Sequence, residues 1–293
     1  MLSSSEQDFQ SGLSTNEGSA NSESLTIEKA IANLQGEDQG LRYYAAWWLG
    51  KFRVNQPEAI KALITALDDE DNRTPDGGYP LRRNAAVALG KLEDISAVPA
   101  LIRCLDCSDF YVREKAAESL GMLGISLKGN PGLRVSISKL MELLAGGLAE
   151  AQPISGSPHL AQPYGAVMEA VGSLGATEAI PLIEPFLDHP TELVQYSAAR
   201  AMYQLTKNPI YGDRLIKALS GDKLQLRRAV LADLGAIGYL PAADAIAKTL
   251  AENSLKIISL KGLLEYQVKN TSSESPHLSE TAIHIMTLMD DLL

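Results

Sequence analysis

The chain has 293 residues, of which 45% are hydrophobic and 21% are charged, as expected for a globular protein able to bury a sizeable core. Aromatic residues make up only 5%, which argues against a sandwich or barrel, because strands are rich in aromatic and β-branched residues. The net charge is −10 and there is no basic tail, which argues against nucleic acid as a partner, because binding to phosphates requires clustered Lys and Arg.

Membrane insertion and secretion are not expected either. No stretch approaches the roughly 20 apolar residues that span a bilayer. The N-terminus is acidic and polar and lacks the basic and apolar regions of a secretion signal. Two cysteines do not make a disulfide framework. We therefore expect a cytoplasmic protein without membrane contact.

Residues 1–24 are rich in Ser, Gln, Asn, Glu and Gly and have few apolar residues. Such a segment cannot bury enough apolar surface to offset the entropy lost on ordering. We predict a disordered tail over residues 1–24 and a single domain over residues 25–293.

From residue 25 onward the chain repeats a helical block about every 30 residues. Clear copies of a Leu-Arg-x-x-Ala-Ala pattern ending in Gly span 41–50, 81–90, 112–121 and 226–235, and weaker copies end at Gly175 and Tyr203 or start near Leu255. Each copy is followed by a second apolar segment, at 59–67, 97–105, 179–187, 210–219, 242–250 and 281–288. A repeat of this length fits two helices and two turns.

Each block has the features of a helix that packs against neighbours. Apolar residues at i, i+4, i+5 and i+8 form one stripe, and the paired Ala allows close approach of another helix. The closing Gly is predicted to end the helix in a left-handed conformation. Pro99, Pro181 and Pro241 stand where a first helical turn tolerates proline. The sequence thus predicts an all-α, HEAT-like superhelix of about six to seven helical pairs.

Three polar insertions, 68–80, 124–163 and 267–280, interrupt the period, although 135–144 within the second is predicted to be helical. Insertions in a solenoid fall at its turns and often carry function.

An aromatic cluster, Tyr43-Tyr44 and Trp47-Trp48, lies in the first block and contains both tryptophans. A helical wheel places four residues on the inward face: Leu41, Ala45, Leu49 and Phe52. Trp48 lies at the edge of that face, and Tyr43, Tyr44 and Trp47 lie outside it. They either pack against a neighbouring turn or the N-terminal flank, or form a platform for a flat ligand or a partner.

Arginine occupies the same position in four blocks, at Arg42, Arg82, Arg113 and Arg227. One interpretation is structural, with the arginines satisfying carbonyl and Asp groups between repeats. The other is ligand binding, because further basic residues stand nearby and guanidinium groups bind carboxylates in a bidentate manner. These further residues are Arg53, Arg83, Lys115 and Arg228.

The sequence shows no constellation typical of a metal site or a nucleophilic enzyme. Cys104 and Cys107 form a lone Cys-x-x-Cys without further ligands, which favours core thiols over a zinc site. The four histidines are scattered, and phosphate-binding, dinucleotide and nucleophile-elbow motifs are not found. The residues alone favour a binding scaffold with no metal and no identified catalytic residue.

Two blocks are more specific than the general repeat: Tyr-Tyr-Ala-Ala-Trp-Trp at 43–48 and Gly-Gly-Tyr-Pro-Leu-Arg-Arg-Asn at 77–84. Together with 101–105 and Asp-Phe-Tyr-Val-Arg at 109–113, they resemble the alpha subunit of the heterodimeric, E/F-type phycocyanobilin lyase of cyanobacteria. The resemblance runs from about residue 25 to the C-terminus.

The resemblance implies that the chain acts with a second, related HEAT-like subunit to attach phycocyanobilin, an open-chain tetrapyrrole, to a cysteine of the phycocyanin alpha subunit. It also implies removal or transfer of the pigment. The bond is a thioether formed when the substrate's thiol adds to the ethylidene group of the bilin. Phycocyanobilin would be a substrate, so no cofactor is expected.

A bilin has a flat conjugated body and two propionates. We therefore expect Tyr43, Tyr44 and Trp47 to contact the body and Arg82, Arg83 or Arg113 to bind the propionates. Two alternatives remain open: the alpha-type subunit of the isomerising phycoerythrocyanin lyase, and a non-catalytic scaffold or phycobilisome-degradation adaptor.

The propionate assignment predicts that Arg83→Ala and Arg113→Ala weaken bilin binding, because each removes a cation that would pair with a carboxylate. Titration of phycocyanobilin into the purified two-subunit complex, followed by absorption, measures the affinity. Parent-like affinity in both variants would refute the assignment.

Overall fold

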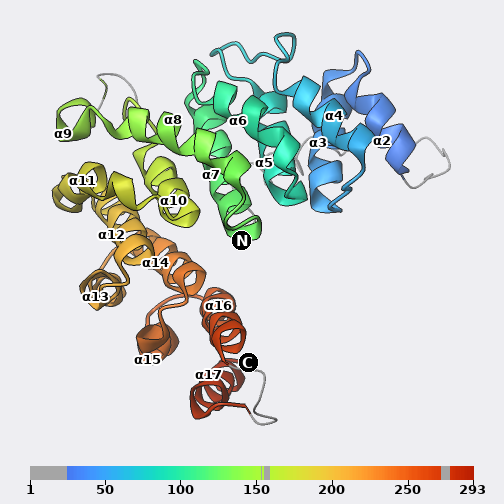
Figure 1. Ribbon diagram of the computed structural model, residues 1–293. Helices are drawn as coiled ribbons and strands as arrows, with labels where there is room; N and C mark the ends of the chain where they lie inside the picture. Colours follow the sequence, from blue (N-terminus) through green and yellow to red (C-terminus); the bar gives the residue numbers. More distant parts are fainter. Residues whose placement is uncertain (1–24, 153, 155–158, 272–277) are drawn as a thin grey trace.

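The computed structural model describes residues 25–152, 154, 159–271 and 278–293. Helices are the regular elements of this part, and they follow one another in a curved double row (Figure 1). The predicted tail, residues 1–24, lies outside the described residues.

The first row of helices lies inside the curve and holds the predicted Arg-Ala blocks. Its members are α3 (Gln39–Lys51), α5 (Pro80–Leu92), α7 (Phe110–Ser126), α10 (Tyr164–Leu174), α12 (Glu192–Thr206), α14 (Leu224–Ile237) and α16 (Asn253–Asn270). We call this the inner row. Each member packs against the next along the chain.

The second row covers the outside of the curve (Figure 1). Its members are α4 (Pro57–Ala66), α6 (Val98–Cys104), α8 (Arg134–Leu144), α11 (Ile180–Ile183), α13 (Pro209–Ala218), α15 (Ala243–Lys248) and α17 (Glu280–Asp290). Helix α2 (Ile27–Leu34) precedes the first pair, and α9 (Gly147–Glu150) lies in the second insertion. The described residues thus form seven pairs, which confirms the predicted architecture, and α8 confirms the predicted helix in the second insertion.

Short 3-10 turns lead into several outer helices. They are η1 (Ile95–Ala97), η2 (Pro131–Leu133), η3 (Thr177–Ala179) and η5 (Leu240–Ala242), while η4 (Glu184–Asp188) follows α11. Pro99 and Pro181 stand in the first turns of α6 and α11, as predicted.

Paired alanines of the inner row are buried completely. Both alanines of the first three blocks have no exposed surface: Ala45, Ala46, Ala85, Ala86, Ala116 and Ala117. A methyl side chain lets two helix backbones approach more closely than larger side chains allow. The inner row is therefore held together along its length by small residues.

The closing glycines do not end the helices, so their predicted left-handed role is wrong for Gly50, Gly90, Gly121 and Gly235. They lie within inner helices against the next inner helix, and a Cβ on Gly50 would stand 2.7 Å from Ala88 Cα. The residue with a left-handed backbone stands three residues after some of these glycines, as Arg53 (φ 49°) does after Gly50. Only the weaker block ending at Gly175 (φ 72°) behaves as predicted.

Replacing Gly50 by Ala is therefore expected to destabilise the protein by about 1–2 kcal/mol, because overpacking outweighs the better helix propensity of Ala. Thermal unfolding followed by circular dichroism should show a melting temperature lower by several degrees.

Gly36→Ala is the control, because Gly36 is exposed and a Cβ there would meet its nearest atom at 3.4 Å. It should change stability by no more than about 0.5 kcal/mol. Equal melting temperatures for the two variants would contradict the proposed role of Gly50.

Candidate functional site

The repeated arginines bind the turns that precede their helices. Each donates to a backbone carbonyl of that turn: Arg42 to Leu34 (3.3 Å), Arg82 to Asp69 (2.6 Å), Arg113 to Cys107 (2.6 Å) and Arg227 to Gly221 (2.6 Å). The structural interpretation of these arginines is thus confirmed. Carbonyls at helix ends lack partners within the helix, and the arginines supply them.

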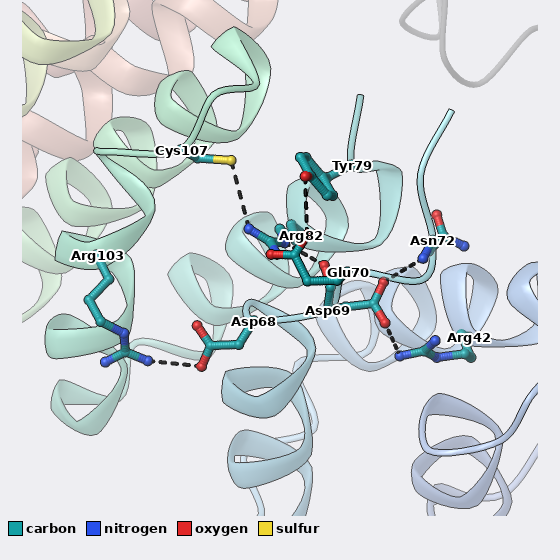
Figure 2. A network of polar contacts seen from close by, with 9 residues as sticks. All are labelled: Arg42, Asp68, Asp69, Glu70, Asn72, Tyr79, Arg82, Arg103 and Cys107. Atoms are coloured by element: carbon teal, nitrogen blue, oxygen red, sulfur yellow. Dashed lines mark hydrogen bonds and ion pairs between the residues drawn. The ribbon is translucent and has the colours of Figure 1, made fainter. Parts of the chain in front are cut away.

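Arg82 is engaged on every side (Figure 2). Its guanidinium pairs with Glu70 at 2.5 Å, approaches the sulfur of Cys107 at 3.9 Å and lies 4.2 Å from the ring centroid of Tyr79. The hydrogen bond from Arg82 also lowers the pKa of Glu70. With 13% of its side chain exposed, Arg82 mainly fixes the loop before α5.

Arg113 joins two successive turns. Besides Cys107, its guanidinium donates to the carbonyl of Ala161 at 3.0 Å and to the side chain of Gln162 at 3.1 Å. These groups precede α10, so Arg113 holds the entry to α10 against that of α7. Its donors are largely used within the protein.

Arg83 is more accessible than Arg82, with 31% of its side chain exposed. It pairs with the Asp109 carboxylate at 2.7 Å and lies 4.5 Å from the ring centroid of Tyr111. Asp109 also accepts hydrogen bonds from the backbone N–H groups of Tyr79 and Tyr111, both at 2.8 Å. Arg83 therefore presents a partly open cation beside an aromatic ring.

That ring belongs to a second aromatic group, which the sequence analysis did not single out. Phe110 stacks on His159 with a centroid distance of 4.2 Å, and Tyr111 meets the same imidazole edge-on at 4.9 Å. His159 comes from the second insertion, so its position could not be read from the repeat.

On α3, Tyr44 and Trp47 are exposed and stack on each other with a centroid distance of 5.4 Å. This confirms that aromatic side chains lie outside the core. Tyr43 is half-buried, and its carbonyl accepts a hydrogen bond from Asn84. The aromatic pair lies within α3, whereas Arg82, Arg83 and Arg113 stand where turns enter α5 and α7.

Leu41 and Phe52 were predicted to face the core, and this prediction is wrong, because both are exposed. Leu41 lies in the first turn of α3, and Phe52 follows its last residue and packs on Trp48. The buried face consists of the central residues of α3, Ala45, Ala46, Leu49 and Gly50.

Contacts between inner helices define which residues are equivalent. The glycine of one helix packs on a small residue of the next: Gly50 on Ala88, Gly90 on Ser119, Gly121 on Ala170 and Gly172 on Ala201. The residue after each small residue is buried, namely Leu89, Leu120, Val171 and Met202. At about 100° per residue, the residue before each small residue therefore lies on the opposite side of its helix, away from the core. We call these residues and their α3 counterpart the groove strip: Trp47, Val87, Glu118, Glu169 and Arg200.

The end of the groove strip at α10 and α12 is charged. Arg200 pairs with Glu169 at 2.7 Å and with Asp233 of α14 at 2.8 Å, and the Ser197 hydroxyl donates to Glu169 at 2.9 Å. Burial raises the pKa of Asp233, an effect that Arg200 opposes. The Arg200 Nε atom is buried and has no hydrogen-bond partner among the described residues.

Glu118 pairs with Lys115 at 2.8 Å on the same helix. Partial burial raises the pKa of Glu118, while Lys115 acts in the opposite direction. Glu118, Glu169 and Arg200 were not predicted from the sequence, because their residue types differ. The available signal for Glu118 and Arg200 was their shared place, six residues after the start of their blocks, whereas the block predicted to end at Gly175 put Glu169 three residues out of register.

The two cysteines of the Cys-x-x-Cys pair differ in exposure. Cys104 is buried, which raises its pKa to about 12, and Cys107 is half-exposed. Across the described ranges, no group of three or more His, Cys, Asp or Glu side chains is arranged to hold a metal ion. None of the described helices combines the length and apolar character needed to cross a membrane.

The curved double row and its repeated contacts define a HEAT-repeat protein. The HEAT-repeat family model matches residues 27–121 and 74–147. The chain is also 59% identical over 273 residues to the phycocyanobilin lyase subunit alpha of Nostoc sp., covering 93% of this chain and 96% of the relative. It is 46% identical to the bilin biosynthesis protein PecE of Mastigocladus laminosus, covering 82% of each.

A solved structure, the complex of CpcE and CpcF of phycocyanin lyase from Nostoc sp. PCC7120, contains a chain that matches with a TM-score of 0.83 and 58% identity. The match covers 96% of this chain and 100% of that one. The chain belongs to the family of phycocyanobilin lyase alpha subunits.

Asp109 is expected to contribute strongly to stability. Its side chain is buried, with 3% exposed, and it pairs with Arg83 and accepts hydrogen bonds from two backbone N–H groups. Asp109→Ala should destabilise the protein by about 2–3 kcal/mol, since it removes a helix cap and strands buried donors. Chemical unfolding measures the change.

Asp68→Ala serves as the control, because 61% of the Asp68 side chain is exposed and it pairs with an equally open Arg103 at 3.0 Å. Asp68→Ala should lower the free energy of unfolding by less than about 1 kcal/mol. If both variants unfolded at the same denaturant concentration, the role given to Asp109 would be wrong.

Proposed function

We propose that this chain is one subunit of a heterodimeric bilin lyase that attaches phycocyanobilin through a thioether to a cysteine of the phycocyanin alpha subunit. The observation that carries the proposal is the 59% identity, over nearly the whole chain, to a phycocyanobilin lyase subunit alpha. The attacking thiol belongs to the substrate protein, so the lyase needs no nucleophile of its own.

The main task of such an enzyme is to hold two reactants in the geometry of attack, which can supply several kcal/mol of the barrier reduction. A rigid curved surface suits this task. Trp47 of the groove strip and Tyr44, which stacks on it, offer an exposed aromatic pair for the flat bilin body. Tyr43 stands beside them, and its predicted contact with the bilin is retained in the proposal.

For the propionates we retain Arg82, Arg83 and Arg113 as candidates and favour Arg83. Arg82 and Arg113 donate to several groups of the protein, whereas Arg83 pairs with Asp109 alone among the described residues and is more exposed than Arg82. Binding a propionate at Arg83 would exchange part of its pairing with Asp109 for a bidentate contact.

The activity requires a second, related subunit. Support comes from the matching structure, which is a complex of two proteins, CpcE and CpcF. The phycocyanobilin lyase assignment is supported by identities of 54–59% to seven phycocyanobilin lyase alpha subunits, while identity to the bilin biosynthesis protein PecE is 46%. A non-catalytic adaptor would have no need to bind bilin.

We further propose that the protein acts in the cytoplasm, where its two free thiols stay reduced, and without a resident cofactor. Phycocyanobilin enters as a substrate.

Reconstitution tests the proposal. The chain, its partner subunit, the apo-phycocyanin alpha subunit and phycocyanobilin are combined, and covalent fluorescence is read after denaturing gel electrophoresis. We expect a fluorescent adduct only when both subunits are present. Omission of each subunit in turn and a substrate with its cysteine changed to Ala are the controls.

Adduct formation by either subunit alone would contradict the heterodimer. If the complex gave no adduct with phycocyanin but did so with the phycoerythrocyanin alpha subunit, the alternative lyase would be correct. If it bound no bilin, the adaptor would remain.

A further inference from the structure

Glu118 is the most exposed carboxylate of the groove strip, with 42% of its side chain accessible. It stands one helix beyond Val87 and two beyond Trp47, between the aromatic end of the strip and its charged end at α10 and α12. A flat ligand resting on the aromatic end would therefore extend toward this carboxylate.

The charged groups around Glu118 come from several helices. Glu114 and Lys115 lie on α7 itself, and Lys115 contacts both carboxylate oxygens of Glu118, at 2.8 and 3.0 Å. On α10, Glu169 faces it, backed by Arg200 of α12. On α5 the corresponding residues, Asn84 and Val87, carry no charge.

One hydrogen-bond donor of this cluster has no partner among the described residues. Glu169 and Asp233 share one terminal nitrogen of Arg200, and the Nε atom of Arg200 is buried without a partner. A buried donor of this kind calls for a partner such as a water molecule, an ion or a ligand.

The chemistry of a bilin complements this arrangement. Its four ring nitrogens lie along the middle of the conjugated body, and those that carry hydrogen are donors. A carboxylate accepts such hydrogen bonds and stabilises a protonated, cationic tetrapyrrole. Protonation withdraws electrons from the conjugated system and makes the ethylidene carbon a better target for a thiol.

We propose that Glu118 binds the ring nitrogens of phycocyanobilin and exchanges with them the proton that the addition reaction requires. This proposal rests on the proposed lyase function, in which Glu118 would be the general acid of the addition reaction.

The step balances without an oxidant or reductant. The Glu118 carboxyl group gives its proton to a ring nitrogen of the bilin. The substrate's sulfur then bonds to the ethylidene carbon as the exocyclic double bond breaks, and the electron pair moves into the conjugated system and neutralises its charge. The ring carbon next to the new thioether takes up a proton as the nitrogen releases one. The proton of the thiol returns to Glu118, so the net change is addition of S–H across the double bond.

Burial raises the pKa of Glu118, the direction that favours its protonated form, although Lys115 opposes this effect. The groove also keeps Lys115 beside it, so that the carboxylate left after proton transfer is stabilised.

The test compares Glu118→Gln with the parent in the full two-subunit complex. Phycocyanobilin is bound, and its absorption is followed against pH. Because the carboxylate stabilises the cationic bilin, its replacement by a neutral amide should let the bound bilin lose its proton at a pH at least about one unit lower. The initial rate of adduct formation should fall on the order of 100-fold, with half-saturation by bilin little changed.

Glu142→Gln is the matched control, because Glu142 forms the same kind of pair with Lys139, three residues away at 3.1 Å, on the outer helix α8. It should behave as the parent. Glu118→Asp should recover part of the rate, which separates a chemical role from a structural one.

Parent-like bilin titration and adduct rate in Glu118→Gln would overturn the inference and leave the lyase function standing. If the parent complex bound bilin but formed no adduct, the lyase function would fall, and the absorption titration would still decide whether Glu118 exchanges a proton with the bilin. A complex that bound no bilin would overturn both.

Discussion

The close contact between successive inner helices is the constraint on which the other features of the structure depend. Small residues bring the backbones together, as where Gly50 meets Ala88 and Gly121 meets Ala170. Larger side chains are excluded at these contact points, where a Cβ on Gly50 would stand 2.7 Å from Ala88 Cα. Bulky apolar residues of the inner row, such as Leu89 and Leu120, are buried in the core, and the groove strip lies on the opposite side of each helix.

The helix ends have a different task from the groove. There, Arg42, Arg82, Arg113 and Arg227 bind the carbonyls of the preceding turns. Asp69 pairs with Arg42, and Asp109 pairs with the neighbouring Arg83. Each repeat is thereby fixed in angle to the next, which preserves the curvature of a fold whose units contact only their neighbours. Binding residues can then occupy fixed positions on a surface that would otherwise bend.

Much of the fold could be predicted from the sequence, because apolar spacing and paired alanines repeat locally. The role of Gly50 could not, since it depends on a helix 30 or more residues away. Leu41 and Phe52 show a similar limit, because a helical wheel ignores where the helix ends. In the site, Tyr44 and Trp47 were predicted as exposed aromatics. Glu118 and Arg200 share a place in their blocks but not a residue type, so the repeat gave a weak signal and tertiary contacts were needed to relate them.

The central claim is that the groove strip of this chain holds the bilin. A crystal structure of the two-subunit complex with phycocyanobilin bound tests it most directly. The account predicts bilin density along the inside of α3, α5, α7 and α10, with a ring nitrogen within hydrogen-bond distance of the Glu118 carboxylate. Density on the outer row, or wholly within the partner subunit, would contradict it.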